Sequence, residues 1–256
     1  SGSRINYAKD DAAGQAIAAR LTAEIQGVAM ASRNAADAQS MIDTTDGALA
    51  ETANILLRMR ELAVQASTGT LSSDDNAALD AEFQQLEAEI DRINSNTKWA
   101  GNSLFHGNAT SFQVGNNSGG ANSISHTFTS MAAHDLGVDS LGADNASGGS
   151  GASADINADL TDATKAAAMI TAVDNAIKLV STERGKLGAL SNRLSSTISN
   201  LDQVRVNLSA SQGRIEDADF AEETSNLAKG QILQQAATAM LAQANASKQT
   251  VLALVR

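Results

Sequence analysis

Residues 17–66 decide the fold, and they read IAARLTAEIQGVAMASRNAADAQSMIDTTDGALAETANILLRMRELAVQA. Positions spaced alternately four and three residues apart form one series, which is apolar at twelve of its fifteen members: Ile17, Leu21, Glu24, Val28, Ala31, Ala35, Ala38, Ile42, Thr45, Leu49, Thr52, Leu56, Met59, Ala63 and Ala66. A repeat of 3.5 residues keeps one face of a helix against a partner and implies a left-handed supercoil. The stretch therefore predicts a long coiled-coil-like helix.

The composition of the whole chain suits long helices better than a compact globule. Its 256 residues contain no proline, which breaks helix interiors, and only 3% aromatic residues against 43% hydrophobic ones. Cysteine is also absent, which excludes a disulfide scaffold, a thiolate zinc site and a cysteine nucleophile. The formal net charge of −11 makes nucleic acid a poor partner, and no stretch is apolar for the roughly 18 residues of a membrane span.

A second helix is expected soon after the first. Gly69 fits a helix C-terminus, and Ser72, Ser73 and Asp74 offer N-cap oxygens for the next helix. That helix has its own apolar series, made of Leu79, Phe83, Leu86, Ile90 and Ile93. The two helices are expected to form a hairpin.

The last hundred residues repeat the heptad pattern. One series consists of Ala166, Ile170, Val173, Ile177, Val180, Arg184, Leu187, Ser191, Leu194, Ile198, Leu201, Arg205 and Leu208. A final series, here called the terminal seam, consists of Leu233, Ala237, Met240, Ala244, Ser247, Val251 and Leu254. Heptads at both chain ends predict a mainly α fold, an elongated antiparallel helical bundle. Short helices in a compact globin-like fold are the alternative.

The middle of the chain changes period. Phe112 and Val114 alternate with polar residues, as do Ile124, His126 and Phe128, and a run rich in Gly and Asn separates the two stretches. This pattern predicts a β-hairpin. Residues 139–153 have no period and are predicted to form an exposed flexible loop.

Motifs that carry chemistry are missing from the chain. His106, His126 and His134 match no zinc-ligand spacing, and His126 fits a half-buried strand position. The acidic groups lack the regular oxygen spacing of a calcium loop, and there is no P-loop or dinucleotide fingerprint. We therefore expect no enzyme, no cofactor and no metal, but a structural or assembly protein whose last helix needs a partner helix.

Several long motifs resemble those of bacterial flagellins. The N-terminal stretch SGSRINYAKDDAAGQAIA at 1–18, ASRNA at 31–35 and RMRELAVQA at 58–66 resemble the N-terminal signature. RIEDADFAEE at 214–223, QILQQA at 231–236 and LAQAN at 241–245 resemble the C-terminal signature. The likeness covers some 200 residues at both ends of the chain.

The resemblance implies a domain organisation. Residues 1–101 would be the N-terminal part of the helical core, 102–138 its β-hairpin section and 139–160 a short variable region. Residues 161–213 would be the C-terminal part of the core, and 214–256 the terminal helix that lies inside a filament. By resemblance we also expect that a helix preceding Ser1 and a large outer domain are missing.

The resemblance also implies a function and partners. The chain would be a secreted subunit that polymerises with itself into the bacterial flagellar filament for swimming, aided by an export chaperone and by cap and junction proteins. A hook–filament junction protein and a flagellin-like cell-surface binding protein are the alternatives. No nucleic acid partner and no membrane insertion are expected.

A last implication concerns a contact surface. In many flagellins the helix with this motif, plus an acidic residue on the next helix, contacts the vertebrate Toll-like receptor for flagellin. The matching residues here are Arg58, Leu62, Gln65 and Glu82, and Leu62 is expected to be exposed beside Arg58. The same face could instead serve packing in the filament. The terminal seam is the second expected assembly surface.

Overall fold

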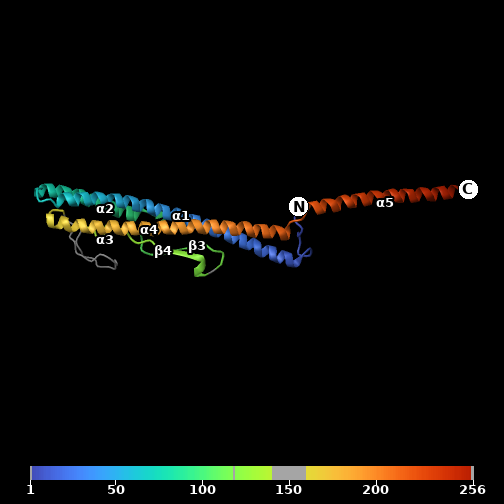
Figure 1. The fold of residues 1–256 in the computed structure, drawn as a ribbon, viewed down its shortest axis with the longest axis horizontal. Coiled ribbons are helices and arrows are strands. Elements are labelled where there is room, and N and C mark those ends of the chain that lie inside the picture. Colours follow the sequence, from blue (N-terminus) through green and yellow to red (C-terminus); the bar gives the residue numbers. More distant parts are fainter. Residues whose placement is uncertain (1, 118, 140–159, 255–256) are drawn as a thin grey trace. The chain divides into compact units, whose positions relative to one another are not determined.

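The computed structural model describes residues 2–117, 119–139 and 160–254, with side chains up to residue 244. The elements in chain order are α1 (Ala12–Ala66), α2 (Ser73–Asn96), β1 (Lys98–Trp99), β2 (Asn102–Ser103), β3 (Ala109–Gln113), the 3-10 turn η1 (Gly120–Asn122), β4 (Ser123–Thr127), α3 (Ala133–Leu136), α4 (Ala163–Glu216) and α5 (Phe220–Leu254) (Figure 1). The mainly α class with long helices at both ends confirms the prediction. The chain divides into unit 1, Ser1–Gln26 with Arg205–Arg256, and unit 2, Gly27–Val204.

In unit 2, α1 and α4 run antiparallel side by side (Figure 1). Three polar contacts join them: Gln39 with Ser191 at 3.5 Å, Asp46 with Arg184 at 2.7 Å and Arg60 with Asp174 at 2.6 Å. From one of these contacts to the next, the residue number on α1 rises while the residue number on α4 falls, as expected for antiparallel helices. The two ends of the sequence therefore build one bundle, as the heptads indicate.

The apolar series of α1 is buried throughout unit 2. Every member from Val28 to Ala66 is shielded from solvent, including the two polar members Thr45 and Thr52. Both hydroxyls donate hydrogen bonds to backbone carbonyls one turn earlier, those of Met41 and Ala48. The hydroxyls are thus satisfied without interrupting the packed face.

The expected series is wrong at the start of α1, in unit 1. Ile17 is 40% exposed, whereas Ala18 is buried. The side chain of Ile5 packs against Gly14, where an added Cβ would come within 2.7 Å of Ile5 Cδ1. A helix of 3.6 residues per turn drifts against a 3.5-residue repeat, so local packing decides which neighbour turns inward.

The buried face of α4 also differs from the predicted one. Five of the thirteen predicted members are buried, namely Ala166, Val173, Val180, Leu187 and Leu194. The positions between them are filled by Met169, Ala176, Glu183 and Leu190, one residue before the predicted Ile170, Ile177, Arg184 and Ser191. The face is rotated because the β-hairpin as well as α1 contacts α4, and Glu183 meets the hairpin residue His126.

The first turn of α2 forms a capping box. The hydroxyl of Ser72 accepts a hydrogen bond from the Asp75 N–H, and the Asp75 carboxylate accepts one from the Ser72 N–H. The hydrogen bond from the Ser72 side chain, with that from its backbone, lowers the pKa of Asp75. Of the candidates Ser72, Ser73 and Asp74, Ser72 is the N-cap.

Polar side chains of α2 hold the returning chain. The Asp80 carboxylate accepts the Leu160 N–H at 3.0 Å, Asp91 accepts the Ala133 N–H and Asn94 accepts the Met131 N–H. The buried residues of α2 are Asn76, Asp80, Phe83, Glu87 and Ile90, a face that the apolar pattern alone predicts only in part. Residues 140–159, which include most of the predicted flexible loop, lie outside the described residues.

The predicted β-hairpin is confirmed as the antiparallel pair β3–β4, in which Phe112 lies opposite Ile124. His126 and Glu183 join it to α4 through a 3.1 Å contact between the His126 Nε2 and the Glu183 carboxylate. A second, unexpected hairpin pairs β1 with β2 through a two-residue turn. Ala100 and Gly101 occupy it with φ of 49° and 86°, the left-handed geometry that such turns need.

In unit 1 the N-terminal residues bind the end of α4. The Arg4 N–H donates to the Glu216 carbonyl, and its guanidinium donates to the Ile215 carbonyl at 2.7 Å. Farther along, the Gln212 amide donates to the hydroxyl of Thr22 on α1. These contacts tie residues that are about 200 positions apart in the sequence.

Candidate assembly surfaces

The terminal seam lies on α5 and is open to solvent in the described residues. Leu233 and Met240 are 59% and 74% exposed, and Ala237 and Ala244 are exposed as well. The side chains of Ser247, Val251 and Leu254 lie outside the described residues. Large apolar side chains in a regular series normally pack against a partner, so this face is a candidate contact.

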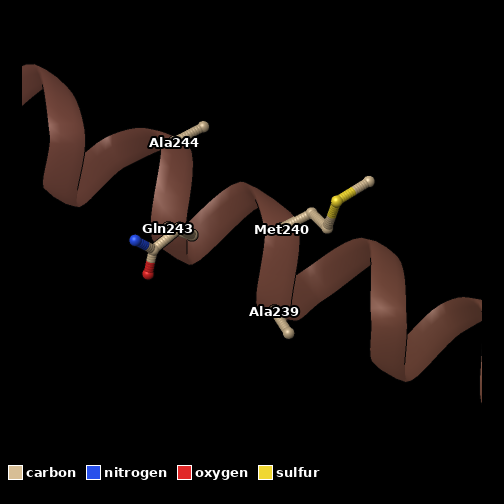
Figure 2. Close-up of a pocket in the computed structure, with 4 residues that line it drawn as sticks. All are labelled: Ala239, Met240, Gln243 and Ala244. Carbon is tan, nitrogen blue, oxygen red and sulfur yellow. The ribbon is translucent and has the colours of Figure 1, made fainter.

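Figure 2 shows the middle of this face, where Met240 and Ala244 project from one side of α5. Together with Ala239 and Gln243 they line a shallow hollow. Because all four residues belong to a single helix, the hollow is an open surface that cannot enclose a small molecule. Its chemistry suits another helix, since small residues beside a flexible Met allow close approach.

The second candidate surface joins α1 to α2. The Arg58 guanidinium donates to one Glu82 oxygen from Nε at 2.9 Å and from Nη2 at 2.7 Å, and Nη1 donates to Glu61. The hydrogen bonds to Glu82 and then Glu61 raise the pKa of Arg58. Arg58 and Glu82 are about half exposed, and Gln65 is exposed on the same helix.

Leu62 does not belong to that exposed surface, and this expectation is wrong. Its side chain is only 1% exposed and lies in the hydrophobic core. Around this position α1 is flanked by α2 and by α4, as the Arg58–Glu82 and Arg60–Asp174 pairs show. Two partner helices bury a wider face than the single seam of a two-stranded coil.

Sequence reasoning missed the polar pair His126 and Glu183. Glu183 is 4% exposed and also accepts a hydrogen bond from the Lys186 ammonium at 2.9 Å. The ring of His126 stands edge-on to Phe128, with centroids 4.8 Å apart. The only sequence signal was the place of His126 in the strand alternation, which does not identify a partner 57 residues away.

Within the described residues, no group of three His, Asp or Glu side chains is arranged to hold a metal ion. None of the described helices combines the length and apolar character that crossing a bilayer requires.

Comparisons with known proteins find related sequences at both helical ends of the chain. Residues 1–110 match the family described as the bacterial flagellin N-terminal helical region, and residues 170–255 match the bacterial flagellin C-terminal helical region. A flagellin of Halalkalibacterium halodurans is 44% identical over the whole chain and 89% of its own length. The flagellin of Bacillus subtilis is 42% identical over the whole chain and 90% of its own length.

Solved structures show the same fold. The crystal structure of Bacillus cereus flagellin is 31% identical, covers 66% of this chain and 88% of its own, and superposes with a TM-score of 0.54. A Vibrio parahaemolyticus structure described as flagellar hook-associated has a TM-score of 0.65 over 81% of this chain and all of its own. At 14% identity it shows a shared fold only.

Nothing in these comparisons favours a junction protein over a filament subunit. The family matches at both chain ends and the relatives that are more than 40% identical over the whole chain are all flagellins. The chain belongs to the bacterial flagellin family, and it is a structural subunit that polymerises into the flagellar filament.

Proposed function

We propose that the terminal seam of α5 is the main contact through which this flagellin joins a filament. The observation that carries the proposal is the exposure of Leu233 and Met240, whereas the seam of α1 in unit 2 is buried. An isolated helix gains little from its apolar face in water, so most of its stability must come from packing. In a filament, helices of neighbouring copies can cover that face.

The test compares two variants that add the same charge to α5. Met240→Glu places a carboxylate in the seam, whereas Gln235→Glu places it about half a turn around the helix, on the opposite side. Salt-induced assembly followed by electron microscopy should show filaments for the parent and for Gln235→Glu, and few or none for Met240→Glu. Equal assembly of both variants would contradict the proposed role of the seam.

The domain organisation stays a proposal along the same lines. Residues 214–256 would form the inner segment of the filament wall, and 1–101, 102–138 and 161–213 the surrounding core. The segment 139–160 would face outward as the variable region. The mainly helical build of both chain ends supports this division.

Other partners are proposed from family membership. An export chaperone would hold the chain before secretion, cap and junction proteins would meet the filament ends, and the assembled protein would lie outside the cell. Exposed apolar residues on α5, such as Leu227 and Leu241, are a surface that a chaperone would need to shield.

A vertebrate Toll-like receptor for flagellin is proposed to bind the surface formed by Arg58, Gln65 and Glu82. The paired Arg58 and Glu82 present a fixed donor and acceptor array, the kind of chemistry found at interface hot spots. Leu62 supports this surface from below. A receptor reporter assay with monomeric protein tests the idea, since Arg58→Ala should reduce potency about tenfold, as loss of about 1.4 kcal/mol requires.

The same surface could be covered by neighbouring copies in the filament. In that case monomers should signal and intact filaments should not. An Arg58→Ala monomer with the parent's potency would show that this surface does not bind the receptor.

A further inference from the structure

A groove in unit 2 lies between α1, the β1–β2 hairpin and β3. Its volume is about 400 Å³, and the residues that matter here are Asn34, Asp37, Met41, Trp99, Ser111 and Phe112. One wall is held in place by the Asn34 amide, which donates to the Gln113 carbonyl at 3.2 Å. A groove whose walls are already fixed loses little conformational entropy when it is filled.

The groove combines an apolar floor with one unpaired charge. Met41, Trp99 and Phe112 are each partly exposed, and Asp37 is exposed beside them. Among the described residues, no hydrogen bond or ion pair engages the Asp37 carboxylate. An aromatic surface beside a carboxylate suits an apolar side chain that is accompanied by a cation.

The partner that meets this surface in a filament is another copy of the chain. Contacts in a helical polymer are head to tail, so the groove must face a different part of the neighbouring subunit. Among the described residues of unit 2, the exposed large apolar ones are Met30, Leu57, Val64, Leu179 and Val204. Among these residues of unit 2, the occupant should be one with a free cation at its side.

Only one described candidate meets both conditions. Leu57 and Val64 lie beside Arg58 and Arg60, which are already paired with Glu82 and Asp174. Leu179 is 45% exposed, and the neighbouring Lys178 ammonium is exposed with no partner among the described residues.

The other two candidates fail for different reasons. Met30 lies on the same stretch of α1 as the groove, one turn before Asn34, so it does not present a different part of the subunit. The cation beside Val204 is Arg205, which already has a partner.

We propose that this groove is a contact between subunits, in which Leu179 of a neighbouring copy rests on Trp99 and Phe112 while Lys178 of that copy pairs with Asp37. The proposal rests on assembly into a filament and adds a specific contact in unit 2 to the seam of α5. The apolar side chain and the charge of this occupant each match a part of the groove.

Trp99 is the only tryptophan of the chain, so its fluorescence reports on this groove alone. Acrylamide quenching should be compared between soluble parent protein and filaments assembled in ammonium sulfate and collected by sedimentation. Quenching should fall about threefold or more on assembly, because the core of an interface is packed like a protein interior.

A charge exchange tests the occupant. Asp37→Lys and Lys178→Asp should each raise the critical concentration for assembly about tenfold, because each places like charges together. The double variant restores opposite charges and should return close to the parent value. Asp43→Lys makes the same charge change on an exposed residue of α1 outside the groove, and it should assemble like the parent.

The possible failures are distinct. Filaments in which Trp99 is quenched as in the monomer would overturn the groove contact while leaving assembly intact. Shielded Trp99 without rescue by the double variant would overturn the Lys178–Leu179 occupant. A parent chain that never forms filaments would contradict its role as a filament subunit, and the groove contact with it.

Discussion

Arg58 and Leu62 lie one turn apart on α1, yet substitution should affect them in different ways. Leu62 is buried, so Leu62→Ala should lower the free energy of unfolding by about 3 kcal/mol through lost burial and a cavity. Arg58→Ala removes an exposed ion pair and should lower the free energy of unfolding much less than Leu62→Ala does. Urea unfolding followed by circular dichroism measures both.

This difference governs how receptor assays must be interpreted. Reduced signalling by Leu62→Ala can result from lost stability, whereas Arg58→Ala changes the surface of a folded protein. If Leu62→Ala were as stable as the parent, the side chain would not be packed in the core.

A second prediction for single residues concerns the capping box formed by Ser72 and Asp75. Ser72→Ala should lower the free energy of unfolding by about 1 kcal/mol, because an N-cap acceptor is lost. Ser73→Ala, one residue along and inside the helix, is the matched control and should have little effect. Equal losses in both variants would show that capping is not the cause.

Acid titration gives the capping box a pH signature. The pKa of Asp75 lies below its ordinary 3.8 in the folded protein, because its carboxylate accepts hydrogen bonds from Ser72. A lowered folded pKa stabilises the protein above the ordinary value, and this contribution is lost as the pH falls through the folded value. The thermal midpoint should therefore fall more steeply between pH 5 and pH 2 in the parent than in Asp75→Asn. Parallel pH profiles would contradict this.

At the scale of elements, the β3–β4 hairpin is attached to α4 through Glu183. Glu183→Ala leaves the His126 ring without its buried acceptor and should cost about 2 kcal/mol, with faster amide exchange in both strands. Asp174→Ala removes an acid of the same helix that is half exposed, and it should cost about 1 kcal/mol or less. Unchanged exchange in β3 and β4 of Glu183→Ala would show that the hairpin is held by other contacts.

Amide exchange should slow more in α5 than in any part of unit 2 when the protein assembles. Its described seam is exposed, so amides between residues 233 and 244 should exchange quickly in the monomer and slowly in the filament. Hydrogen exchange measured by mass spectrometry on both states makes the comparison. Strong protection of these amides in the monomer would mean that the seam is already covered.

The whole molecule should tolerate an insertion in the segment proposed as the variable region. Gly148 and Gly149 lie in a polar, Gly-rich stretch outside the described residues, and its flanks are held by α2, where Asp80 binds Leu160 and Asp91 binds Ala133. A short epitope inserted between the two glycines should leave the thermal midpoint unchanged within about 2 °C, because loop length adds little to the cost of folding. A fall of many degrees would place this stretch in the core.

The sequence alone determined the class and the length of the helices, because heptad spacing and the absence of proline are local properties. The series from Val28 to Ala66 is buried as expected, and the alternating stretches that contain Phe112 and Ile124 form the expected β-hairpin. These features need only one face of one element to be apolar. The family signatures at both ends likewise lie in continuous stretches of sequence.

Only the tertiary structure decided which neighbouring residues turn inward where three elements meet. Leu62 is buried because α2 and α4 flank α1 together, and Glu183 is buried because the hairpin covers α4. Asp80 is buried on α2 because the Leu160 N–H donates to its carboxylate. A polar side chain can be buried when a residue distant in the sequence supplies its hydrogen-bond partner, and local periodicity does not reveal such a partner.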